Sequence, residues 1–170
     1  TLDRSSAASD VYKRQYQISV YENVQDDEYS VLMMDSFEVK LKNKFLPFLY
    51  PNQYVEFTSK TKAVKEAKKL AKDSKDDLAI VKAVYNYVVK NVKYDDEKAE
   101  NVQSGYLPSV DETLKTKKGI CFDYAALMTA MLRSQGIPTK LEIGYSGDIY
   151  HAWISTWLNE KDIIYPSLFI

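Results

Sequence analysis

The chain contains one cysteine and one histidine, which stand thirty positions apart in two distinctive local sequences. Cys121 follows Gly119 and precedes a run of strong helix formers, whereas His151 lies in the short sequence Tyr-His-Ala-Trp. One thiol and one imidazole are the minimum equipment for catalysis by a cysteine nucleophile, because the imidazole can take the thiol proton. The functional question is therefore whether the fold brings these two side chains together.

The residues around Cys121 predict that it opens a buried helix, which Gly136 caps and Pro138 ends. A thiol in the first turn of a helix lies in the partial positive charge of the helix N-terminus, which lowers the pKa of a thiol and favours the reactive thiolate. The unpaired backbone N–H groups there can also hold a developing oxyanion. We expect His151 to lie in a strand that returns beside this helix and supplies the base.

Both residues also have ordinary structural explanations. A lone cysteine before an apolar helix is more often a small buried hydrophobe, and a lone histidine next to a tryptophan is more often a packed residue. One cysteine and one histidine supply two ligands where a structural zinc site needs four, so we expect no metal and no cofactor. Asp123 could be a ligand, or it could form a salt bridge or hydrogen bond in the first helical turn.

The rest of the chain predicts the elements that must position this pair. Periodicity predicts helices over about 63–72, capped by Ser59 or Thr61, and over about 77–91. Ser109 or Asp111 can cap a short helix that runs to Lys117 and that Gly119 stops. Short strands are expected over 16–21, 29–34, 37–41, 139–145 and 150–158, with a polar turn over 23–28, a polar connector after residue 95 and a turn at Gly147-Asp148.

Length and composition bound the organisation of the chain. The 170 residues suit one domain with a small appendage: a disordered or artefactual tail over 1–15, an accessory β-rich segment over 16–57, and a core over 58–170. The net charge of −1 gives no electrostatic reason to expect a nucleic acid or an anionic membrane as partner, and the lysine-rich stretch over 60–75 is diluted by acidic residues. No apolar run approaches the ~20 residues of a membrane span, and a single cysteine excludes a disulfide within the chain.

Four segments between about Ala79 and Leu158 follow, in order, the pattern of one known family. They are YNYVVKNVKYD over 85–95, KGICFDYAA over 118–126, RSQGIPTK over 133–140 and His-Ala-Trp at 151–153. The second resembles the nucleophile motif Gly-x-Cys-x-Asp-Tyr-Ala of the transglutaminase-like superfamily, whose core is similar to that of papain-like cysteine peptidases. The resemblance implies an α+β fold of a bacterial type, with the nucleophile at the N-terminus of a buried helix packed on an antiparallel sheet.

The same resemblance implies a nucleophile at Cys121, a base at His151 and an aspartate that orients the histidine, in an Asp-Pro-Thr/Ser context about fifteen residues later. The sequence departs from the pattern there, because Tyr165-Pro166-Ser167 occupies the approximate place. Either the chain is truncated at its C-terminus or its triad is incomplete. Asp162 is a nearby acid, but it matches no family motif. Loss of an orienting acid can cost orders of magnitude in rate, because the imidazole tautomer is no longer held.

The activity implied by the resemblance is acyl transfer on protein or peptide amides through a thioester, with water or an amine as acceptor. The resemblance also implies an extracellular or cell-surface monomer that acts on protein or peptide. Two alternatives stay open: a non-catalytic module that binds peptide or a cell-wall component in the same cleft, and a gene fragment with no function of its own.

Overall fold

The computed structural model of the chain describes residues 13–40, 43–158 and 161–165, and it describes side chains over 15–40 and 43–158. The chain divides into two compact units, Thr1–Leu46 and Pro47–Ile170, which are described separately. The functions expected of the segments 1–15, 16–57 and 58–170 stay predictions.

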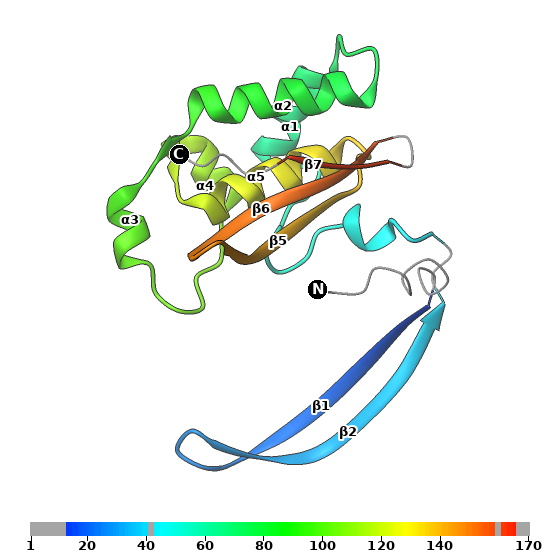
Figure 1. Cartoon of the computed structure of the whole chain (residues 1–170), viewed down its shortest axis with the longest axis vertical. Helices are drawn as coiled ribbons and strands as arrows, with labels where there is room; N and C mark the ends of the chain where they lie inside the picture. The colour runs from blue at the N-terminus through cyan, green and yellow to red at the C-terminus, as the bar shows by residue number, and fades with distance from the viewer. Residues whose placement is uncertain (1–12, 41–42, 159–160, 166–170) are drawn as a thin grey trace. The chain divides into compact units, whose positions relative to one another are not determined.

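The first unit contains an antiparallel hairpin of β1 (Lys13–Gln25) and β2 (Glu28–Lys40), shown in Figure 1. Its turn is tighter than the polar stretch 23–28 predicted, because Asp26 adopts the left-handed conformation at φ 48°. The strands expected over 29–34 and 37–41 form one continuous strand, β2, except for Leu41, which lies outside the described residues. The pairing of Lys13 with Lys40 also extends β1 into the stretch expected to be a tail.

Phe37 shows how the environment of this hairpin differs from the prediction. The alternating pattern at 37–41 indicates a half-buried strand, yet Phe37 is 43% exposed. Within this unit the described hairpin has two strands and no second layer to cover one of its faces. Alternation therefore marks the strand correctly but does not show what buries it.

The second unit packs helices against one three-stranded antiparallel sheet in the order β5-β6-β7. The helix α5 (Cys121–Ser134) lies between the sheet and the helices α1, α2 and α4, as Figure 1 shows. The 3-10 helix η1 (Leu46–Phe48) begins at the last residue of the first unit. The other elements of the second unit are α1 (Lys62–Ala71), α2 (Asp77–Asn91), β3 (Lys93–Tyr94), α3 (Asp96–Asn101), α4 (Val110–Thr116), β4 (Lys118–Gly119), β5 (Thr139–Ser146), β6 (Ile149–Leu158) and β7 (Lys161–Tyr165). This is the α+β arrangement that the family resemblance implies.

The helix α5 is the centre of the core, as its all-round apolar sequence predicts. Its residues from Asp123 to Arg133 are all buried. The helix begins at Cys121 and ends before Gly136, whose φ of 81° only glycine adopts without strain. The buried Arg133 holds the segment that follows α5 in place, because its guanidinium donates to the carbonyl oxygens of Thr139 at 2.8 Å and Tyr50 at 2.6 Å.

The predicted cap of α1 is wrong in detail, and a tertiary contact explains why. No side-chain cap from Thr61 is found at α1; instead the Asp111 carboxylate of α4 accepts from the backbone N–H groups of Lys62 and Ala63. The cap of α4 is Ser109, one of the two expected residues. The helix α4 ends at Thr116, one residue before the predicted end, and its C-cap Lys117 takes the left-handed conformation at φ 56°, so Lys117 stops the helix in place of Gly119.

The short strands β3 and β4 place the start of α5 next to the end of α2. They pair in parallel, with Tyr94 opposite Gly119. The Asp95 N–H donates to the Gly119 carbonyl at 3.1 Å. None of the described helices has the length and apolar composition needed to cross a membrane.

Candidate active site

Cys121 is the first residue of α5, a helix of 14 residues, and its thiol is free and half-buried. The N–H groups in the first turn of any helix have no partner within the helix, so they point toward whatever lies beyond the N-terminus. The structure thus places the expected nucleophile at the helix start that the sequence predicts.

His151 reaches the same place from the sheet. It lies near the start of β6, shortly after the two-residue turn Gly147-Asp148, and pairs in register with Gly144 of β5. Trp153, two positions further, lies against Gly144, where an added Cβ would be 3.2 Å from the indole ring. Its indole N–H donates to Glu142 at 2.9 Å. The His-Ala-Trp sequence therefore combines a site residue with the tryptophan that fixes the neighbouring strand.

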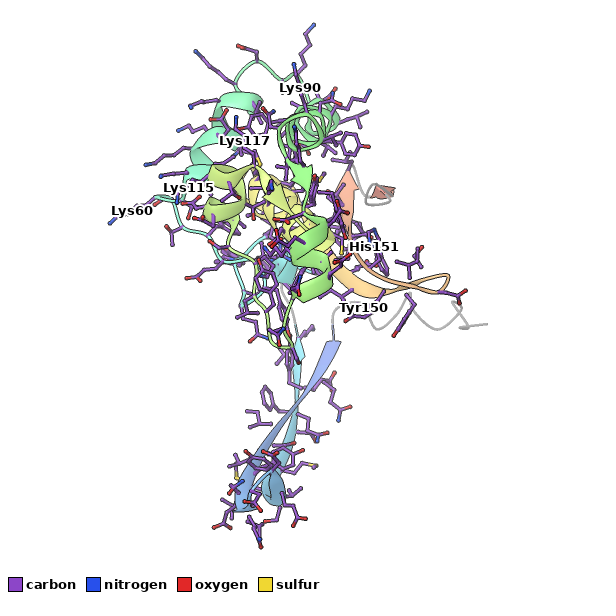
Figure 2. All side chains as sticks on the ribbon, turned by 90° about the vertical axis from the view of Figure 1, so that its left-hand side faces the viewer. Lys60, Lys90, Lys115, Lys117, Tyr150 and His151 are labelled. Carbon is purple, nitrogen blue, oxygen red and sulfur yellow. The ribbon has the colours of Figure 1, made fainter. Side chains whose placement is uncertain are left out.

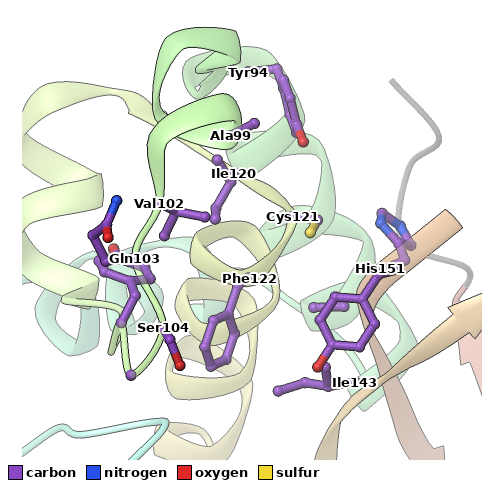
Figure 3. A pocket seen from close by; sticks show the side chains of 14 residues that line it. Tyr94, Ala99, Val102, Gln103, Ser104, Ile120, Cys121, Phe122, Ile143 and His151 are labelled. Carbon is purple, nitrogen blue, oxygen red and sulfur yellow. The ribbon is translucent and has the colours of Figure 1, made fainter.

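A pocket of about 540 Å³ joins the two residues. Figure 3 shows the Cys121 sulfur directed into it and the His151 ring on the opposite side. The pocket lies between the start of α5, the segment that follows α3, and the β5–β6 hairpin. It is lined by Tyr94, Ala99, Val102, Gln103, Ser104, Gly105, Tyr106, Ile120, Cys121, Phe122, Ile143, Tyr150, His151 and Ala152. The structure thus brings together the two residues that the sequence singles out.

Several lysines lie away from this pocket. Figure 2 shows Lys60, which belongs to the lysine-rich stretch 60–75, together with Lys115 and Lys117 on the other side of this unit from His151. The described residues also contain no group of three or more His, Cys, Asp and Glu side chains that could hold a metal ion.

Asp123 is fully buried in the first turn of α5 and holds the start of the helix in place. Its carboxylate accepts from the Ile120 N–H at 2.8 Å, from the Lys98 ammonium at 2.7 Å, and from the Tyr106 hydroxyl. The Lys98 ammonium lies 2.6 Å from the same hydroxyl. We call Lys98, Tyr106 and Asp123 the Asp123 cluster. Of the alternatives left open for Asp123, the structure shows a salt bridge and a hydrogen bond in the first turn.

The Asp123 cluster ties the pocket wall to α5, because Lys98 belongs to α3 and Tyr106 to the segment after it. Burial lowers the pKa of Lys98, but the hydrogen bonds from its ammonium to Asp123 and Tyr106 outweigh that effect and leave the pKa raised. Burial and the Asp123 carboxylate together raise the pKa of Tyr106, so that its hydroxyl keeps its proton and stays a donor.

Gly119 is required by the close approach of Asp123. A Cβ at position 119 would lie 2.6 Å from the Asp123 Cβ and 3.0 Å from its Oδ2. The glycine of the nucleophile motif therefore makes room for the carboxylate that holds the helix start.

Tyr94 faces the same pocket from β3, and Figure 3 shows its hydroxyl pointing toward Cys121. Burial raises the pKa of Tyr94, and the nearby Cys121 and Asp96 raise it further. Tyr94 is thus a protonated hydroxyl close to the candidate nucleophile.

The described part of β7 brings no acid opposite His151. Asp162 pairs with Trp157, six residues along β6 from His151, which is roughly 20 Å at the usual rise of about 3.3 Å per residue. Tyr165 pairs with Ile154, three residues from His151. Pro166 and Ser167, which stand at the expected Asp-Pro-Thr/Ser position, lie outside the described residues. Asp162 is thus too far along the sheet to orient His151.

Comparison with known proteins agrees with this architecture. The model of the transglutaminase-like superfamily matches residues 65–164, which is more than half of the chain. The chain belongs to the transglutaminase-like superfamily. It is 30% identical over 147 residues to UPF0252 protein MJ1282 of Methanocaldococcus jannaschii, an alignment that covers 81% of the chain and 42% of that protein.

Solved structures share the arrangement at low sequence identity. A protein named as a candidate cysteine protease from Cytophaga hutchinsonii has a TM-score of 0.61 at 18% identity, over 91% of this chain and 64% of its own. The periplasmic domain of TgpA from Pseudomonas aeruginosa has a TM-score of 0.53 at 20% identity, over 67% of this chain and 45% of its own. The chain thus spans less than two thirds of each of these three proteins.

Three residues near the site are not identified by the sequence reasoning. Lys98 and Tyr106 lie in the stretch that the sequence predicts to be a polar connector, and Tyr94 is singled out only as part of a family motif. The sequence contains one signal for the first pair: an aspartate two residues after the nucleophile, in a helix predicted to be buried, needs a cationic partner. Nothing in the sequence shows which lysine supplies it.

Proposed function

We propose that this chain is a cysteine hydrolase or acyltransferase that acts on amide bonds of proteins or peptides. The observation that supports it best is the shared pocket, in which a free thiol at the start of a buried helix faces the imidazole of the His-Ala-Trp strand. In this proposal Cys121 is the nucleophile and His151 is the base, and no metal or cofactor takes part.

The reaction has two balanced halves. The Cys121 thiolate attacks the amide carbonyl carbon, a C–S bond forms, and the carbonyl electron pair moves to oxygen. When the intermediate collapses, the C–N bond breaks and the leaving amine takes a proton from the His151 imidazolium, which leaves a thioester. Water or an amine then gives its proton to His151 and attacks the thioester. Cleavage of the C–S bond releases the product and restores the thiolate.

We further propose that two donors stabilise the oxyanion, the Cys121 backbone N–H and the Tyr94 hydroxyl. The first is unpaired within α5, and the second lies beside Cys121 and keeps its proton. Loss of one oxyanion donor typically lowers kcat about 10²–10³-fold. Tyr94→Phe should therefore lower kcat by this factor with little change in KM, and an unchanged kcat would remove Tyr94 from the mechanism.

The rival function is a non-catalytic module that binds peptide or a cell-wall component in the pocket. One specific observation favours it, because the described part of β7 supplies no acid for His151. We propose an extracellular or cell-surface placement, which the resemblance and the fold shared with a periplasmic domain support. We propose a monomeric state on the resemblance alone.

Turnover of a general acyl donor separates these functions. Purified protein is incubated with unfolded casein in the presence and absence of a biotinylated primary amine, and intact mass and biotin incorporation are followed. Cleavage supports a hydrolase, and biotin incorporation supports a transglutaminase. Both must disappear in Cys121→Ser and fall steeply in His151→Ala. Binding of casein fragments without turnover, equal in Cys121→Ser, would instead support the binding module.

A further inference from the structure

The wall of the pocket beyond Cys121 carries no permanently charged side chain. None of the fourteen lining residues is Asp, Glu, Lys or Arg, although these residues make up 28% of the chain. The lining side chains away from the Cys121–His151 pair are aliphatic, aromatic or small, apart from the uncharged polar amide of Gln103. A charged group that entered this pocket would lose water without gaining an opposite charge.

The apolar lining is also exposed where a ligand would cover it. Val102 is 38% exposed on one side, and Ile143 and Tyr150 are 41% and 65% exposed on the other. Figure 3 shows Val102 on the side of the segment after α3, Ile143 on the side of the sheet, and Phe122 between them beside Cys121. Apolar side chains that converge on a hollow are typical of a ligand-binding site, because an apolar ligand group removes their surface from water.

Contacts within the protein hold Phe122 and Tyr106 of this wall in place. The Phe122 ring packs edge-on against Tyr106 at 6.4 Å and at a tilt against Tyr54 at 6.1 Å, both measured between ring centroids. The Tyr106 hydroxyl and the Lys98 ammonium are bonded to Asp123. The Lys98 ammonium, which lies beside the segment 102–106, is thus bonded to a buried carboxylate and is not presented to a ligand.

We propose that the groove between residues 102–106 and the β5–β6 hairpin is a subsite for an uncharged, apolar or aromatic side chain of a peptide acyl donor, next to the carbonyl that Cys121 attacks. This inference rests on the proposed function and adds the substrate class to it. Val102 and Ile143 are its specificity-determining residues, and Phe122 is its floor.

Peptidyl chloromethyl ketones, which alkylate the cysteine sulfur with loss of chloride, test the subsite. A series with Leu, Phe, Ala, Glu or Lys next to the reactive ketone is compared by the second-order rate of modification, measured by intact mass. Each rate is divided by the rate with iodoacetamide, which reports the thiolate without filling the subsite. The Leu and Phe probes should react at least about tenfold faster than the Glu and Lys probes, the range that small changes in an apolar pocket produce.

Introducing a charge into the subsite sharpens the test. Relative to the iodoacetamide rate of the same variant, Val102→Asp should slow the Leu probe and speed the Lys probe, each about tenfold. Leu78→Asp is the matched control, since Leu78 is also 38% exposed but lies on α2 outside the pocket lining. It should leave the preference unchanged.

The failures of the two proposals are distinguishable. Fast, His151-dependent reaction with iodoacetamide but equal rates for all peptidyl probes, or faster reaction with the charged ones, would overturn the subsite and leave the proposed function standing. Slow reaction with iodoacetamide that does not change in His151→Ala would overturn both.

Discussion

Replacing Lys98 with methionine tests whether the Asp123 cluster holds the start of α5 in place. The substitution keeps the aliphatic stem but leaves the Asp123 carboxylate, which is 0% exposed, without its countercharge. Breaking a buried pair by removing one partner costs about 3–5 kcal/mol. Because the Lys98 side chain is 31% exposed and the Ile120 N–H and Tyr106 hydroxyl still donate to the carboxylate, we expect the lower end, about 3 kcal/mol.

Chemical denaturation followed by far-UV circular dichroism measures this loss. The double variant Lys98→Met/Asp123→Asn removes both charges, so it should be more stable than the sum of the single effects predicts, with a coupling of about 2 kcal/mol. The matched control is Lys69→Met. Lys69 also pairs with a carboxylate at 2.8 Å, that of Glu66, but its side chain is 73% exposed, so its loss should leave the stability nearly unchanged.

Two results would refute the role given to Lys98. One is an equal loss of stability in Lys98→Met and Lys69→Met, and the other is additivity of the changes at Lys98 and Asp123. Either result would mean that the buried carboxylate does not depend on the lysine, so that α3 and the pocket wall are held by packing alone.

Three further predictions concern the same helix and its surroundings. Gly119→Ala should destabilise the protein by about 2–3 kcal/mol and slow alkylation of Cys121, because the new Cβ would lie 2.6 Å from the Asp123 Cβ. Thermal melts and alkylation rates check both effects. A melting temperature equal to that of the wild type would contradict the close approach. Thr129→Val should raise stability by about 1 kcal/mol in a urea titration, because among the described residues the Thr129 hydroxyl is buried without a hydrogen-bond partner; a loss of stability would reveal a partner. Folding raises the pKa values of Lys98 and Tyr106. Their contributions to the free energy of unfolding are therefore complete below the unfolded pKa values of about 10 and are lost as the pH rises through the higher folded values. Unfolding measured from about pH 8 to about pH 11.5 should show stability falling above about pH 10, and less steeply in Tyr106→Phe.

Local sequence predicts the elements whose own residues determine them. The helix α5 has apolar residues all round and a glycine and proline at its exit, so its start at Cys121 and its burial follow from the sequence alone. The β5–β6 hairpin follows from two β-rich runs around Gly147-Asp148. In contrast, α3 is mostly polar and too short to show a period, so the sequence indicates only a connector there.

Contacts between distant residues cannot be predicted in the same way. Asp111 caps a helix that begins 49 positions earlier, and Lys98 pairs with an aspartate 25 positions later. A side chain that finds its partner across the fold leaves no local pattern. The placement of Cys121 and His151 in one pocket follows from a family resemblance, and physical reasoning on the sequence alone leaves it open.

The reactivity of the single thiol tests the central claim most directly. Because Cys121 is the only cysteine, the rate of alkylation by iodoacetamide can be followed against pH without interference from another thiol. If Cys121 is an activated nucleophile paired with His151, the rate reaches half its maximum well below the free-thiol value of roughly pH 8.5, and His151→Ala moves this midpoint upward. A midpoint at or above roughly 8.5, unchanged in His151→Ala, would contradict the account and leave the binding module as the better explanation.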